Sequence, residues 1–271
     1  MSWIALLIFV LTATGVGESQ PTVADAGGAK PCGVSISKCG CTIAAPGFYD
    51  VSAMDLLDVT LNKDNSCIAI KSPNVILDLD GKMLGGSGAG TGIHVLPGAN
   101  GSFIEGEAGI ISGWDTGILV EASNVVIENL SSNSNASNGV ELNKAHNVTI
   151  SRITSNSNSK SGIWLNISSF SQVVGSAEIE SNKGPGILIG CTTGCSKSSV
   201  SNQNRILGNM MVTSNQGGIV VAAGSQHNVI TGNAASMNSG DDLMDSNNDC
   251  GTNLWFNNGT APVVEPVTCV H

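Results

Sequence analysis

The sequence predicts an all-β fold, a single-stranded right-handed parallel β-helix solenoid of about seven rungs with disulfide-stapled caps at both ends. Three observations predict it: a strand pattern that recurs along the chain, turn-forming residues between the strands, and cysteines gathered mostly outside the repeats. Charged residues make up 12% of the chain and aromatic residues 4%, so the core is expected to consist of Val, Ile and Leu.

The repeat is a glycine, or once an aspartate, followed by a strand of alternating apolar residues. Successive copies are separated by 25, 22, 23, 24, 32 and 24 residues, which suits one solenoid turn per repeat. The period-2 alternation favours strands over helices, and the Leu consensus of leucine-rich repeats is missing. The seven copies begin at Gly92, Gly117, Gly139, Gly162, Gly186, Gly218 and Asp242.

A second strand in each repeat is indicated by an asparagine before another alternating segment. Stacked asparagines at equivalent turns can form a hydrogen-bonded ladder. The longest interval holds an irregular insertion near Cys191. The second-strand segments begin at Asn74, Asn124, Asn147 and Asn228.

The ends of the chain divide it into four segments. Residues 1–26 are interpreted as a signal peptide, with cleavage near residue 17 or 26, because a short apolar run is followed by small residues. This run is shorter than the roughly 20 residues of a membrane helix, so no membrane span is expected in the mature chain. We expect an N-terminal cap at 27–73, the β-helix at 74–249 and a C-terminal cap at 250–271, in a secreted, periplasmic or extracellular protein.

The eight cysteines all follow the signal segment, and an even number suits an oxidising compartment. Zinc is the alternative, but their spacing matches no common zinc finger. The pairs Cys191–Cys195, within the insertion, and Cys250–Cys269, after the repeats, are therefore predicted.

Alternation along the first strand of the repeat gives two outward columns of side chains. Candidate catalytic residues are Glu121 and Glu141, whose Cβ atoms are expected about 8 Å apart, within reach of an inverting carboxylate pair. The alternative is that these are ordinary solvated side chains. The candidate substrate-binding residues on the same face are His94, Trp164, Asn143 and Asn166.

Distinctive segments lie near both ends of the chain, at 39–49, 67–70, 74–84 and 90–95 at the start, and at 249–258 with Cys269 at the end. These segments resemble the right-handed parallel β-helix proteins of the pectin-lyase-like superfamily. The resemblance implies the same fold, and it implies that Cys39 pairs with Cys67 and Cys32 with Cys41. It leaves the activity open, since that superfamily holds lyases, hydrolases, epimerases, tailspikes and binding proteins.

The catalytic signatures of that superfamily are mostly missing. Gly240-Asp241-Asp242 resembles one polygalacturonase element, but the other three are absent. Arg152 and Arg205 are the only arginines, and neither lies in an acidic cluster of the kind a Ca²⁺-dependent lyase needs. No cofactor or metal is therefore predicted, with Ca²⁺ as the alternative.

The formal net charge of −10 disfavours nucleic acid as a partner. The sequence predicts a secreted protein that binds or acts on extracellular carbohydrate through an outward sheet face. If it is an enzyme, its activity would be that of a polysaccharide lyase or glycoside hydrolase. A non-catalytic structural or adhesive surface protein is the alternative.

Overall fold

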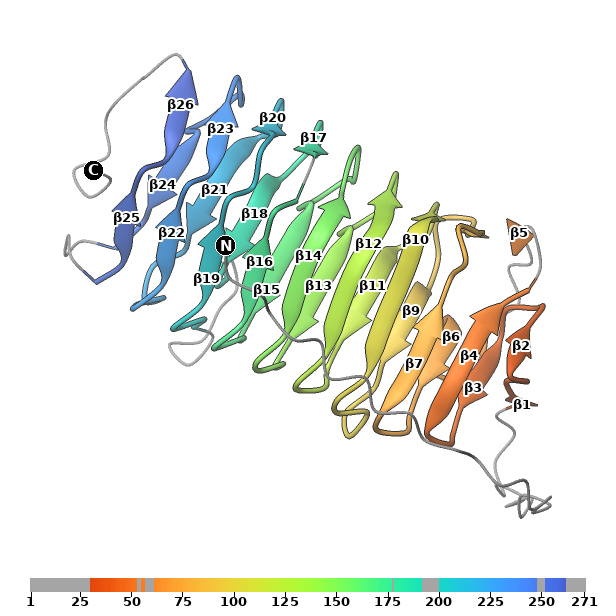
Figure 1. Ribbon diagram of the computed structural model, residues 1–271. Coiled ribbons are helices and arrows are strands. Elements are labelled where there is room, and N and C mark those ends of the chain that lie inside the picture. Colours follow the sequence, from red (N-terminus) through yellow and green to blue (C-terminus); the bar gives the residue numbers. More distant parts are fainter. Residues whose placement is uncertain are drawn as a thin grey trace, which may run out of the picture.

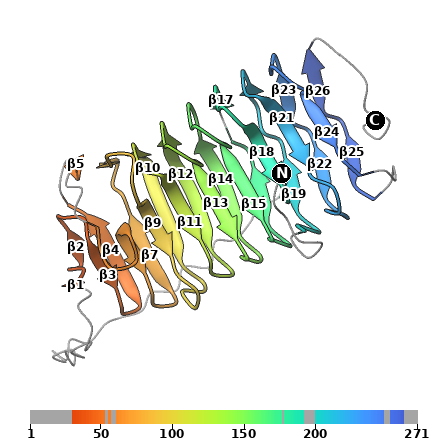
Figure 2. The same ribbon diagram turned by 180° about the vertical axis from the view of Figure 1, so that it is seen from behind.

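The computed structural model describes residues 30–52, 55–56, 61–176, 178–191, 200–247 and 252–261. The predicted signal peptide, Cys195, Cys250 and Cys269 lie outside these residues. The described chain contains 26 strands and no helix, hence none that is long and apolar enough to cross a bilayer. The strands stack in rows along one elongated solenoid (Figures 1 and 2).

One wall of the solenoid, sheet A, holds ten parallel strands. It carries the predicted repeat, in which the Ile and Val side chains after the glycine are buried. The row is longer than the predicted seven rungs because β1, β3 and β6 continue it into the expected N-terminal cap. The strands are β1 (Lys30–Pro31), β3 (Cys41–Ile43), β6 (Ser66–Ile70), β9 (Thr91–Val95), β11 (Thr116–Val120), β13 (Val140–Asn143), β15 (Ile163–Asn166), β18 (Pro185–Ile189), β21 (Gly217–Val221) and β24 (Leu243–Asp245).

The second wall, sheet B, also consists of parallel strands. Every second side chain of these strands points outward. Its main path is β2 (Ser35–Ile36), β4 (Gly47–Val51), β7 (Val75–Asp78), β10 (Phe103–Ser112), β12 (Val126–Asn133), β14 (Thr149–Thr154), β16 (Gln172–Val174), β19 (Arg205–Leu207), β22 (Val229–Thr231) and β25 (Leu254–Phe256).

A third wall was not predicted. It begins with β5 (Asp55–Leu56) and β8 (Met83–Gly85), passes through the second halves of β10, β12 and β14, and continues in short separate strands. The pairing of β10 with β12 shifts register between Glu105 and Gly109, where the chain turns from one wall to the next. The short strands are β17 (Ile179–Glu180), β20 (Val212–Thr213), β23 (Ala234–Ser236) and β26 (Gly259–Ala261).

The glycine of each repeat lies where successive rungs approach most closely. A Cβ added at Gly139 would collide with Ser155 Oγ and lie 2.6 Å from the carbonyl oxygen of Gly162. Gly117 and Gly162 are crowded by the next rung in the same way. The repeat therefore needs glycine for space, not for an unusual φ angle.

Buried asparagine ladders join the turns of successive rungs. In the longest ladder, Asn158 donates from its backbone N and from Nδ2 to Asn182 Oδ1, at 2.9 and 3.0 Å, and it accepts the same two bonds from Asn135. Its second amide hydrogen goes to the carbonyl of Ser132. Every buried polar atom of this amide is thus satisfied. The ladder runs through Asn135, Asn158, Asn182, Asn215 and Asn238 and ends on Asp242.

The predicted asparagine register is wrong at one position. Asn124 and Asn147 share an exposed column and a hydrogen bond of 2.7 Å. Asn228 is instead paired with Asn204 and Asn253 in a buried ladder, one residue further along the turn. The outward and inward turn positions are adjacent in the sequence, and an asparagine can occupy either, so the pattern alone does not separate them.

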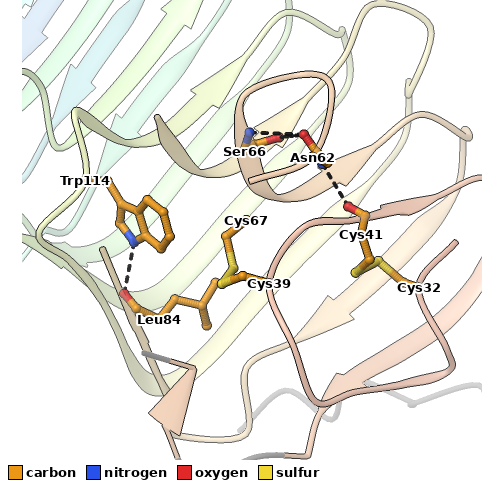
Figure 3. The surroundings of a disulfide bond; sticks show 8 residues. All are labelled: Cys32, Cys39, Cys41, Asn62, Ser66, Cys67, Leu84 and Trp114. Carbon is orange, nitrogen blue, oxygen red and sulfur yellow. Dashed lines mark hydrogen bonds between the residues drawn. A yellow bond between two sulfur atoms is a disulfide. The ribbon is translucent and has the colours of Figure 1, made fainter. Parts of the chain in front are cut away.

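The start of the solenoid is closed by two disulfides (Figure 3). Cys32 pairs with Cys41 and Cys39 with Cys67, as the family resemblance implied. Asn62 fixes the loop between them, donating to the carbonyl of Cys41 and accepting from Ser66. Cys191 is disulfide-bonded, but its predicted pairing with Cys195, and that of Cys250 with Cys269, fall outside the described residues.

Candidate functional site

The outer face of sheet A brings the predicted residues together in two adjacent columns. Strand pairing aligns His94, Leu119, Glu141 and Trp164 across consecutive rungs. Asn143 and Asn166 are paired in the neighbouring column, which also holds Glu121. The strand alternation therefore predicted the positions of these side chains correctly.

Four of these side chains form one hydrogen-bonded row. Glu121 accepts from His94 Nε2 with Oε2 and from Asn143 Nδ2 with Oε1, both at 2.9 Å. Asn166 extends the row to Asn143 at 3.4 Å. His94 is only 9% exposed, and among the described residues its Nδ1 has no hydrogen-bond partner.

Glu141 has a separate environment. Its Oε2 accepts a hydrogen bond of 2.9 Å from Asn138 Nδ2. Burial raises the pKa of the Glu141 carboxyl above its ordinary value. The Asn138 bond and the charge of Lys160 lower that pKa, while the carboxylates of Asp115 and Glu121 raise it. The net rise favours a carboxyl that holds its proton, as a proton donor must.

Next to Glu141 lies a cavity of about 300 Å³. The Trp164 indole forms part of its wall and is fixed by a 2.7 Å hydrogen bond from Nε1 to the carbonyl of Gly190. Two lysines, Lys160 and Lys183, bring positive charge to a chain that is acidic overall. The other lining residues are Asn138, Ser159, Ser161, Gly184, Pro185, Leu188, Cys191 and Gln216.

The predicted residues thus divide into two groups. Trp164 belongs to the cavity, and Glu141 is linked to it through Asn138. His94, Glu121, Asn143 and Asn166 form the row beside it. The two predicted catalytic carboxylates have different hydrogen-bond partners and no bond to each other in the described structure.

Sequence reasoning missed Asn138, Lys160 and Lys183. They lie in the turns that lead into the strands of sheet A, where the sequence shows no alternation that would reveal their direction. Their position shortly before the glycine of a repeat was the only feature of the sequence that could have indicated them. Asn138, for example, directly precedes Gly139.

No group of three or more His, Cys, Asp or Glu side chains in the described ranges is arranged to hold a metal ion. The site brings together an aromatic ring, amides, hydroxyl groups, lysines and carboxyl groups. Such a wall can stack on a flat apolar ring face and hydrogen-bond to hydroxyl groups.

Comparisons with known proteins place the fold. No curated protein matches the sequence. Tailspike protein 2 of an Escherichia coli O157:H7 bacteriophage is similar in structure, with a TM-score of 0.53, 17% identity, and coverage of 79% of this chain and 31% of the tailspike. A mutant of the periplasmic alginate epimerase AlgG gives a TM-score of 0.49 at 15% identity, over 73% of this chain and 46% of the epimerase.

The chain thus spans less than half the length of these structures, and at such identities the likeness concerns the fold alone. The family model described as right handed beta helix region matches residues 85–235, which is 151 of the 271 residues. The chain belongs to the right-handed β-helix family.

Proposed function

We propose that this protein binds an extracellular or periplasmic carbohydrate in the cavity on sheet A. The observation that carries the proposal is the Trp164 indole, held in the cavity wall by its bond to Gly190 and surrounded by amide, hydroxyl and lysine groups. A tryptophan face packs against the apolar face of a sugar ring, and the polar groups orient the hydroxyls.

The compartment is part of this proposal. The two disulfides of the N-terminal rungs are typical of proteins that fold in an oxidising environment. The predicted secretion signal agrees with such a location.

Glu141 supports a second candidate function, cleavage of the bound carbohydrate. A carboxyl with a raised pKa beside a sugar-binding cavity is suited to protonate a leaving oxygen. Glu121, which accepts two hydrogen bonds, is the proposed carboxylate partner. His94, Asn143 and Asn166 then position Glu121.

Binding is tested with the purified mature protein on an array of neutral, acidic and amino-sugar glycans. We expect at least one glycan to bind, and Trp164→Ala to weaken its Kd by about tenfold or more because the stacking surface is lost. Trp164→Phe should restore part of the affinity. Phe48→Ala, an exposed aromatic on sheet B, is the matched control and should leave the Kd unchanged. If the folded protein binds none of the glycans, the proposal is wrong and a structural or adhesive role is favoured.

Cleavage is tested with the glycan that binds. Release of reducing ends or of unsaturated products is followed for the wild type, Glu141→Gln and Glu121→Gln. We expect each variant to lose about 100-fold or more in rate while Kd changes little, because the ring contacts remain. Binding without turnover by the wild type would contradict the catalytic candidate and leave the binding proposal standing.

A further inference from the structure

The outer face of sheet B, a different wall from the one with the carbohydrate site, carries two parallel columns of side chains. One column is acidic and the other is apolar. Strand pairing aligns four carboxylates on consecutive rungs, which we call the acidic column: Asp50, Asp78, Glu105 and Glu128. Two residues earlier on the same four strands lies the apolar column: Phe48, Ile76, Phe103 and Val126.

The acidic column is poorly neutralised. Within the described part of the chain, Glu128 is the only member with a cationic partner, Arg152 at 3.0 Å. Asp50 has a hydrogen bond from Ser35, and Asp78 accepts from the backbone of Asp80. Like charges directly opposite one another on neighbouring strands destabilise a sheet, so a cationic ligand would relieve the repulsion within this column.

The apolar column is open to solvent at its N-terminal end. Phe48 is 52% exposed and Ile76 is 43% exposed. By contrast Leu77, the inward-facing residue next to Ile76, is fully buried. An exposed apolar strip beside a row of charges has the character of a contact surface.

We propose that this face of sheet B docks a basic amphipathic α-helix of a partner protein. Strands β7, β10 and β12 are already paired on both sides, and β4 is paired with β2 at Asp50 and Val51, so the backbone of these rungs is largely closed to an added strand. A ligand must therefore bind through side chains. The acidic column requires a cationic stripe, and the apolar column requires an apolar stripe next to it.

A helix lying across the strands fits the spacing of the columns. Rungs repeat at about 4.8 Å, and one turn of an α-helix rises 5.4 Å. One basic side chain per turn therefore meets about one carboxylate per rung over the four rungs, with the i, i+4, i+7 apolar residues beside it. An extended strand repeats its side chains on one face at about 6.6 Å, which matches the rung spacing less well than a helix turn does.

The test uses a fluorescently labelled synthetic helix of about 18 residues, with lysines on one stripe and leucines on the adjacent one. Binding to the mature protein is measured by fluorescence anisotropy at low salt. The comparison peptide has the same composition in a scrambled order that destroys both stripes. We expect the ordered peptide to bind at least about tenfold more tightly than the scrambled one.

Two variants separate charge from apolar contact. The double variant Asp78→Asn/Glu105→Gln and the single variant Phe48→Ser should each raise the Kd for the ordered peptide by about fivefold or more. The matched control Glu178→Gln/Glu180→Gln makes the same charge change on the third wall and should leave binding unchanged. Trp164→Ala should also leave it unchanged, which keeps this proposal separate from the carbohydrate site.

Equal binding of the two peptides, equal loss in the control variant, or no binding at all would each overturn the proposal. An oligomer of glucosamine is included as a cationic carbohydrate probe. If it binds through the acidic column and the ordered peptide does not, the face recognises an amine-bearing glycan and the helix proposal is wrong. Circular dichroism on each variant confirms that a loss of binding is not a loss of fold.

Discussion

Glu141 shows how one side chain on a sheet surface can differ from its neighbours. It shares a column with Leu119 and Trp164, and these bulky side chains on the adjacent rungs accompany its burial. Burial raises the pKa of Glu141, and the single hydrogen bond from Asn138 does not cancel this effect. At the scale of the residue, the surroundings on the sheet face raise the pKa of one carboxyl group above its ordinary value.

This environment predicts a dependence of stability on pH. Because the folded protein holds the Glu141 proton to a higher pH than the unfolded chain does, the free energy of unfolding falls as pH rises above the ordinary pKa of 4.5. The fall ends once pH exceeds the raised pKa of the folded state. Glu141→Gln removes this loss, so its stability relative to the wild type should grow with pH across the same window.

Urea unfolding midpoints between pH 4 and pH 8 measure this effect. Lys160→Met is the informative comparison, because loss of the Lys160 charge raises the pKa of Glu141 further and should extend the fall to higher pH. A pH-independent difference between wild type and Glu141→Gln would show that Glu141 is not protonated preferentially in the folded state.

The columns of the candidate site could be predicted, but their contacts could not. Strand alternation and the repeat length fixed His94, Glu141 and Trp164 on one line. The bond between His94 and Glu121 joins diagonal positions on adjacent rungs, and its formation depends on side-chain rotamers. Asn138 escaped notice because a turn residue has no periodicity from which its direction can be inferred.

At the scale of the elements, the turns are joined from rung to rung by hydrogen bonds, as the strands are. Asn158 is fully buried, and its amide makes bonds to rungs on both sides. The repeat can thus vary its surface residues while the ladder holds the turns in register.

Removal of one ladder amide should be costly. Asn158→Ala removes the acceptor of the Asn135 backbone N, one of the two acceptors of Asn135 Nδ2 and one of the two side-chain donors to the carbonyl of Ser132, and we expect a loss of about 3 kcal/mol in the free energy of unfolding. Asn147→Gly is the control: it removes an exposed bond and tolerates the positive φ at that position, so its effect should stay below about 1 kcal/mol. Chemical denaturation of the two variants measures both values. Equal losses would contradict the importance of the buried ladder.

The elements that escaped prediction are the shortest. The strands of the third wall from β17 onward have two or three residues, too few for an alternating pattern to stand out. Earlier in the chain the third wall is formed by the second halves of the long strands β10 and β12. Each of these strands belongs to two walls, and their pairing shifts register where one wall meets the next.

At the scale of the whole molecule, each rung contacts only its neighbours along the axis. The stability of such a solenoid is a sum of rung and interface contributions, and opening can begin at either end. The disulfide Cys39–Cys67 ties the turn before β3 to β6 and closes 28 residues of chain, which opposes opening at the N-terminal end.

Hydrogen exchange should report this directly. With disulfides intact, amides of β11, β13 and β15 should exchange slowest, because complete rungs cover them on both sides, and those of β24 and β25 should exchange faster. Reduction under native conditions should accelerate exchange in β3 and β6 and leave β13 protected. Uniform acceleration along the chain would indicate a single cooperative unit.

Asp242 closes the buried asparagine ladder at its C-terminal end. It occupies the position that is glycine in the six preceding repeats, and its Oδ1 accepts from the backbone N and the Nδ2 of Asn238. That carboxylate therefore stands where the asparagine of a following rung would stand. A strand stacked on β24 would meet a side chain at 242, whereas the earlier repeats leave room for the next rung with glycine, so this position disfavours an extension of the ladder.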